Sequence, residues 1–165
     1  MSLTGLPSND LTATFDLLAV PEVRRLVHRL SVAEYQHLGA EGILPRKTEL
    51  IRGVVVDKPR LTPLHCYLSE RLRTWIESGV RTGWNIRSGH PITTPDSEPE
   101  PDLFVARGCL DDFRYSHPTT GALAIEVAVT TEKLDRHKAA IYAEAGVDEY
   151  WIVLANRRCV EVHRS

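Results

Sequence analysis

The hydrophobic positions of this chain gather into short runs of strand length. The longest run, residues 121–129, is apolar or glycine at every position except Glu126, which is typical of a strand covered on both faces of a sheet. Residues 52–53 predict a hairpin turn or bulge, and residues 156–157 predict the turn of a second hairpin. Further strands are predicted by the runs at 48–57, 84–90, 102–106, 148–154 and 159–163.

Helical segments alternate with these strands. From residue 63 to 78, apolar side chains recur at three and four positions, the spacing of an amphipathic helix packed on a sheet. Thr130 or Thr131 can cap another helix that reaches Ala145, with Gly146 placed to end it. The mixed order predicts an α/β (α+β) fold with a central strand–helix–strand unit, whose connection should be right-handed.

The first part of the chain has a different character. Residues 1–29 are predicted to be an N-terminal extension, partly helical over 21–30, where Pro occupies the first turn. Ser31 and Glu34 then match a capping box, which predicts a helix to about residue 37. We therefore place the folded domain at residues 30–165.

Composition narrows the class of protein. The chain has 165 residues, of which 25% are charged and 42% hydrophobic, as expected of one soluble globular domain. A formal net charge of −2 argues against binding to nucleic acid by bulk charge, so any such contact must be local. Cys66, Cys109 and Cys159 are far apart without a CxxC spacing, which predicts free thiols. No leader or apolar span is recognised, and we expect a cytoplasmic protein without membrane contact.

Glu126 is the first candidate for chemistry, because a buried carboxylate normally pairs, protonates or binds a cation. Asp102 begins the preceding predicted strand. If the two strands are neighbours, both carboxylates can converge on one end of the sheet, where oxygen ligands suit Mg²⁺ or Mn²⁺. The alternatives are structural: an ion pair between Glu126 and an arginine, and a turn-capping role for Asp102 after Pro101.

The helix after the Glu126 strand adds a cation. Asp135, Lys138 and Tyr142 stand at i, i+3 and i+7, so they share one helix face. That face could look into the carboxylate pair. The alternative is a solvated Asp–Lys pair with Tyr142 partly buried.

These residues occur in a recognisable pattern. Pro101-Asp102, the segment Ala-Ile-Glu-Val at 124–127, and D-R-x-K-x-x-x-Y-x-x-x-G-V-x-E-Y-W-I-V from Asp135 together resemble the Uma family of restriction endonucleases, a branch of the PD-(D/E)XK nuclease superfamily. Residues 30–35, 49–55 and 63–65 are also similar, so the resemblance covers about residues 30–164.

The resemblance implies a restriction-endonuclease-like core, a mixed central β-sheet flanked by helices, with Asp102 and Glu126 as metal ligands. The superfamily places a lysine two residues after the acidic ligand, but that position is Ala128 here. The family moves the lysine to the following helix, which assigns its role to Lys138. Supporting positions are implied for Glu49, Tyr142 and His65. Residues 129–132 depart from the family's Ser-Pro-Ser-Thr, which predicts a different start to this helix.

The implied function is a metal-dependent endonuclease that hydrolyses DNA phosphodiester bonds with Mg²⁺ or Mn²⁺. A lysine beside two carboxylates should have a raised pKa, which favours charge stabilisation over base chemistry for Lys138. Because duplex-cleaving enzymes usually pair two active sites, a homodimer is expected. Six arginines are candidates for substrate contacts, although most should be solvated: Arg71, Arg73, Arg87, Arg107, Arg114 and Arg136.

Two other functions stay open at this point. One is a catalytically inactive nuclease fold that acts as a nucleic-acid-binding or protein-interaction module, with the N-terminal residues docking a partner. The absence of a lysine at position 128 and the acidic net charge favour it. The other is an antitoxin-like or dimeric scaffold in which the hairpin 150–162 forms the interface.

Overall fold

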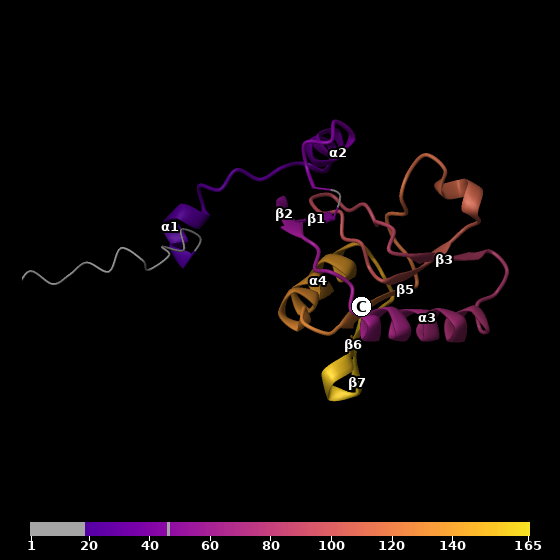
Figure 1. Ribbon diagram of the computed structural model, residues 1–165. Coiled ribbons are helices and arrows are strands. Elements are labelled where there is room, and N and C mark those ends of the chain that lie inside the picture. Colours follow the sequence, from indigo (N-terminus) through magenta and orange to yellow (C-terminus); the bar gives the residue numbers. More distant parts are fainter. Residues whose placement is uncertain (1–18, 46) are drawn as a thin grey trace, which may run out of the picture.

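A five-stranded sheet separates two layers of helical and hairpin structure in the computed structural model, which describes residues 19–45 and 47–165 (Figure 1). The helices are α1 (Pro21–Arg24), α2 (Val32–Ala40), α3 (Pro63–Glu77) and α4 (Glu132–Glu144). The strands are β1 (Thr48–Ile51), β2 (Val54–Asp57), β3 (Trp84–Ser88), β4 (Leu103–Arg107), β5 (Leu123–Ala128), β6 (Glu149–Leu154) and β7 (Cys159–Arg164). Short 3₁₀ turns cover Leu110–Phe113 and Ala155–Arg157.

The main sheet is mixed and has the order β3-β4-β5-β6-β7. Only β5 and β6 run parallel, and the other neighbours are antiparallel. A parallel pair needs a crossover connection, which α4 provides. β1 and β2 form a separate antiparallel hairpin. The predicted α+β class, with a mixed central sheet and a strand–helix–strand unit, is therefore confirmed.

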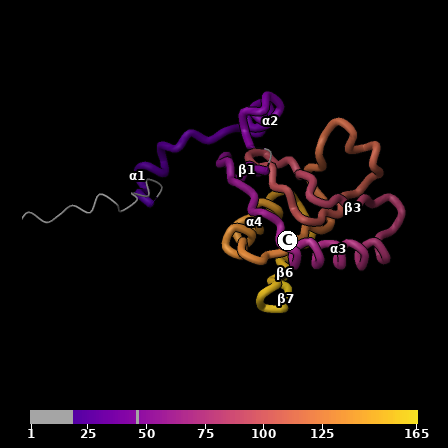
Figure 2. The backbone as a smooth tube through the Cα atoms, viewed as in Figure 1, coloured from indigo at the N-terminus to yellow at the C-terminus, as the bar shows by residue number. Residues whose placement is uncertain are grey.

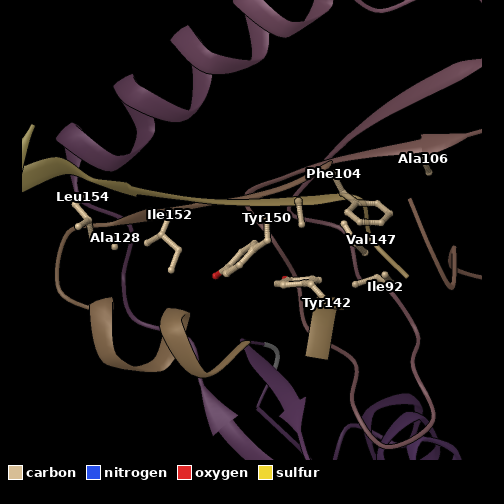
Figure 3. Packing of buried hydrophobic residues seen from close by; sticks show 10 residues of the cluster. Ile92, Phe104, Ala106, Ala128, Tyr142, Val147, Tyr150, Ile152 and Leu154 are labelled. Carbon is tan, nitrogen blue, oxygen red and sulfur yellow. The ribbon is translucent and has the colours of Figure 1, made fainter. Parts of the chain in front are cut away.

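Side chains alternate between the two faces of the sheet, and each face has its own hydrophobic core. Toward α3, Ile76 packs with Leu103, Val105 and Ile125. On the opposite face, a larger cluster gathers around Tyr142 of α4, as Figure 3 shows with α3 on the far side of the sheet. Glu126 lies between Ile125 and Val127 in sequence, so its side chain points to the α4 face. The buried pattern of β5 confirms a strand covered on both sides.

The sequence predicts the start of α2 correctly but predicts a longer α1 than the structure has. Ser31 Oγ accepts from the Glu34 N–H at 3.2 Å and Glu34 reaches back to the Ser31 N–H at 2.8 Å, the predicted capping box. The helix predicted over 21–30 instead ends at Arg24. No residue of α1 is buried, so nothing offsets the cost of nucleating a longer helix, and the Leu30 N–H donates to the Gly53 carbonyl. Figure 2 traces this segment away from the sheet. The part of the predicted extension before residue 19 lies outside the described residues.

The three cysteines lie at the surface. Cys66, Cys109 and Cys159 are all exposed and free, as predicted. Within the described ranges, every helix is too short or too polar to span a lipid bilayer.

Gly121, just before β5, occupies a position without room for a side chain. A Cβ there would lie 2.5 Å from Phe104 Cζ and 2.6 Å from the Val105 carbonyl oxygen. We expect Gly121→Ala to lower the free energy of unfolding by about 1–3 kcal/mol, because overpacking moves both the core ring and the β4 backbone. Urea denaturation measures the change.

Gly39 in α2 is the matched control, since an added Cβ meets nothing within 4 Å. Gly39→Ala should stabilise the protein by about 0.5–1 kcal/mol through helix propensity. Equal stability of Gly121→Ala and wild type would show that the close approach at β4 does not constrain the fold.

Candidate active site

Asp102 and Glu126 are brought together by the pairing of β4 with β5. The antiparallel register places Leu103 opposite Ile125, so the preceding Asp102 lies level with Glu126. The Val127 N–H donates to Asp102 Oδ2 at 2.7 Å. Asp102 therefore holds the neighbouring strand rather than capping its own turn, which was the structural alternative.

Lys138 of α4 lies against this pair from the adjoining layer. Its Nζ donates to Glu126 Oε1 at 2.9 Å and to Glu49 Oε1 at 2.8 Å, and lies 3.9 Å from Asp135 Oδ1. The side chain of Lys138 is only 3% exposed, which excludes the alternative of a solvated surface pair. The spacing of Asp135, Lys138 and Tyr142 thus marks a buried face.

The supporting positions come from three further elements. Glu49 projects from β1, and its Oε2 accepts from the Glu100 N–H at 3.1 Å. His65 stands in the first turn of α3, where its Nε2 lies 2.9 Å from Asp102 Oδ2. The Tyr142 hydroxyl donates to Glu126 Oε1 at 3.4 Å. The six predicted site residues therefore form two hydrogen-bonded groups, Lys138 with Glu49, Glu126 and Tyr142, and Asp102 with His65, which meet where β4 pairs with β5.

Burial dominates the electrostatics of the network. It raises the pKa of Glu126 to about 8, against the opposing effect of Lys138 and with further contributions from Asp102, Asp135 and Glu49. Burial acts to lower the pKa of Lys138, but Glu126 and Glu49 outweigh it and hold that pKa above its ordinary value. Lys138 is therefore a fixed ammonium, and Glu126 is the carboxyl group that titrates near neutral pH.

This shift predicts a pH dependence of stability. Because the pKa of Glu126 is raised from 4.5 to about 8 in the folded state, the folded protein binds more protons than the unfolded chain between these values. The stabilisation that the protonated Glu126 contributes is fully present below about pH 4.5 and is lost as the pH rises through about 8. The free energy of unfolding should fall by at most about 1.4 kcal/mol per pH unit over this range.

The measurement is urea denaturation of the metal-free protein across this range, with Glu126→Gln as the comparison. The variant has no carboxyl group at this position, so its stability should fall less steeply with pH. Parallel profiles for the two proteins would contradict the raised pKa.

A small cavity of about 60 Å³ opens between these groups, and it is large enough for a few waters or an ion. Its polar lining comprises Glu49, Thr62, His65, Asp102, Glu126, Thr130, Thr131, Asp135 and Lys138, with Lys58 and Arg60 at one side. The sequence spacing groups Asp135 with Lys138 but does not assign Asp135 to the site. The structure shows that Asp135 lines the cavity, because Lys138 pairs with both Glu126 and Glu49 there.

The donor set fits a hard divalent cation. Asp102 Oδ2 and Glu126 Oε1 are used in hydrogen bonds, whereas Asp102 Oδ1 and Glu126 Oε2 accept none from the residues that the structure describes. Within the same residues, no three His, Cys, Asp or Glu side chains form a preassembled metal cage. Mg²⁺ accepts such a site, because it binds through one or two carboxylates and keeps several waters.

Most of the candidate substrate arginines face solvent or surface carboxylates, as expected. Arg136 pairs with Glu161 at 2.7 Å, and Arg73 pairs with Glu77 at 2.8 Å. Arg87 is the exception. It is only 7% exposed.

A solved structure shares the fold of this chain. A similar solved structure is described as "a putative nuclease belonging to DUF820 from Anabaena variabilis", with a TM-score of 0.68, 17% identity, and coverage of 82% of this chain and 79% of that one. At that identity the likeness shows the fold. No curated protein matches the chain.

The sequence itself shows the family. Residues 32–165 match Uma2, described as "Putative restriction endonuclease". The chain belongs to this Uma2 family, which confirms the resemblance seen in its motifs.

Proposed function

We propose that this protein is a metal-dependent endonuclease that hydrolyses DNA phosphodiester bonds. The observation that carries the proposal is the buried Lys138 ammonium, 2.9 Å from Glu126 Oε1, on a carboxylate that lies level with Asp102. The position where the superfamily usually has its lysine is the uncharged Ala128 in this chain. Lys138 supplies the ammonium from α4 instead. Family membership supports the same function.

Asp102 Oδ1 and Glu126 Oε2 would hold the cation, Mg²⁺ or Mn²⁺. When bound, such a cation polarises the phosphate and lowers the pKa of an attacking water. Asp102 is oriented for this role by the Val127 N–H and by His65. Glu126 is oriented by Lys138 and by the Tyr142 hydroxyl.

Lys138 serves as a positive charge and not as a base. Its pKa lies above the ordinary value, so it retains its proton throughout the reaction. The ammonium offsets negative charge that develops on the phosphate in the transition state. Glu49 accepts from the same ammonium at 2.8 Å and fixes its position from β1.

The test is a supercoiled plasmid incubated with wild type in Mn²⁺, in Mg²⁺ and in EDTA. Nicking should require metal and should be lost in Glu126→Ala, while Glu70→Ala, an exposed acidic position on α3, retains it. A plasmid that is bound but stays intact with both metals would replace this proposal with the non-catalytic nucleic-acid-binding module. A homodimer, a cytoplasmic location and the domain limits at 30–165 stay predictions.

A further inference from the structure

Arg87 of β3 is a buried guanidinium without a counter-charge. It is 7% exposed, and no carboxylate lies within ion-pair distance of it among residues 19–45 and 47–165. Its Nη2 donates to His117 Nδ1 at 3.5 Å. Its Nε is buried with no partner at all in the same residues. A buried arginine is normally paired, so this one needs an explanation.

Phe113 and His117 contact the Arg87 guanidinium. Its Cζ lies 4.9 Å from the centroid of the Phe113 ring. Burial lowers the pKa of Arg87 with no carboxylate opposing it. The pKa of nearby His90 is likewise lowered, by desolvation first and then by the positive charge of Arg87, against a raising contribution from Glu100. The guanidinium is therefore the main positive charge of this cluster, and neither side chain that contacts it is acidic.

A recess of this composition is suited to an anion. Keeping an unpaired charge out of water costs several kcal/mol, and the planar fork of arginine matches phosphate oxygens in a two-point contact. His117 and Phe113 line a cleft of about 1250 Å³ that extends to α2, and Arg87 contacts both side chains. Glu98 and Glu100 also line this cleft, where Glu100 pairs with Lys58 and Glu98 accepts from Gln36 and Thr93. A phosphate group in the cleft beside His117 could replace the missing counter-charge.

The sheet places this recess beside the candidate active site. Arg87 pairs with Phe104, and Phe104 pairs with Ala124, two residues before Glu126. Directly paired residues share a face, so Arg87 and Glu126 lie on the same side of the sheet. Two strand spacings and two residues along β5 put their Cα atoms roughly 12 Å apart.

We propose that Arg87, with His117 and Phe113, forms a phosphate-binding subsite that holds a backbone phosphate of the nucleic acid near the one to be cleaved. Recognition of a phosphate rests on the unpaired guanidinium alone. Its assignment to the nucleic acid backbone rests on the proposed endonuclease function. The subsite would position the strand without reading its sequence.

The first experiment tests the phosphate site without any nuclease assay. In phosphate-free buffer, Arg87→Met should raise Tm by about 2–4 °C, because the substitution removes an uncompensated buried charge. Inorganic phosphate at ten times its Kd should raise the wild-type Tm by roughly 3 °C relative to chloride of equal ionic strength. Arg87→Met should lose this increase. The control is Arg81→Met, the same charge change at an exposed position between α3 and β3.

The second experiment identifies the source of the phosphate. Fluorescence anisotropy in EDTA should show labelled duplex DNA binding to Arg87→Met about tenfold more weakly than to wild type. DNA binding by the variant should release about one ion fewer than binding by wild type. The slope of the logarithm of DNA affinity against the logarithm of salt concentration should therefore change by about 0.9. Arg87→Lys, which keeps the charge without the planar fork, should fall between the two, and Arg81→Met should bind like wild type.

The two experiments distinguish failure of the phosphate subsite from failure of the endonuclease proposal. A lower Tm for Arg87→Met in phosphate-free buffer, together with DNA affinity equal to that of Arg81→Met, would overturn the proposal and leave Arg87 a structural residue. A phosphate response through Arg87 without any change in DNA affinity would overturn its assignment to the nucleic acid backbone. Arg87-dependent DNA binding by a protein that does not cut DNA would support the subsite while the endonuclease proposal fails.

Discussion

Lys138→Met is expected to lower the free energy of unfolding at neutral pH by about 3–5 kcal/mol, the largest loss among the substitutions considered. The ammonium bridges Glu49 and Glu126 at 2.8 and 2.9 Å, and the three side chains are at most 7% exposed. Methionine matches the aliphatic part of lysine but leaves the Glu49 carboxylate buried without a cation and the Glu126 carboxyl group without its ammonium donor. Removing one member of a buried ion pair has a cost of this size because the remaining charge stays desolvated.

The pH dependence of this loss provides an internal check. Protonation relieves an unpaired buried carboxylate, so the variant should recover part of its stability in mild acid. Urea denaturation near pH 5 and pH 8 measures the difference. Lys133→Met is the matched control, because it is the same substitution at an exposed position on α4 and should change stability by less than about 0.5 kcal/mol. Equal effects of the two substitutions would mean that the buried bridge contributes nothing.

Glu126→Gln should abolish nicking activity and change stability little, whereas Lys138→Met should mainly lower stability. A divalent cation contributes several kcal/mol to stabilising the transition state, so nicking should fall at least about 10³-fold. The fold should tolerate the change near pH 7, because the raised pKa of about 8 already favours the protonated, neutral carboxyl group in the metal-free protein. Glutamine is close in shape to that neutral form, and its side-chain oxygen can still accept from Lys138.

Single-turnover cleavage of a supercoiled plasmid in Mn²⁺ measures this effect, alongside urea denaturation of the same preparation. Because the variant should be folded, a loss of activity can be assigned to the site. Wild-type cleavage by a folded Glu126→Gln protein would remove this carboxylate from the mechanism.

Much of the fold follows from local signals in the sequence. The Ser31–Glu34 capping box and the apolar run of β5 each depend on residues close together in the chain, and the structure confirms both. The spacing of Asp135, Lys138 and Tyr142 predicts one helix face, although spacing alone does not say whether that face is buried or solvated. The family motif indicated that Lys138 belongs with Glu126, and the structure places them 2.9 Å apart.

Other features depend on contacts that local patterns do not encode. Arg87 lies in an alternating strand like many exposed arginines, and its contacts with Phe113 and His117 join residues 26 and 30 positions apart in the chain. The Leu30 N–H donates to the Gly53 carbonyl, 23 residues later, a contact that the helical pattern over 21–30 does not predict. The hydrogen bond from the Glu100 N–H to Glu49 likewise joins a loop to β1 across 51 residues.

The claim on which the account depends is that Asp102 and Glu126 hold one divalent cation together. Titration of Mn²⁺ into the metal-free protein, followed by the electron paramagnetic resonance of free Mn²⁺, tests it directly, with and without bound DNA. The account predicts a single site that tightens as the pH rises toward about 8, because binding displaces the proton of Glu126, and that is lost in both Asp102→Asn and Glu126→Gln. Undiminished Mn²⁺ binding by either folded variant, or no binding by wild type even with DNA present, would contradict it.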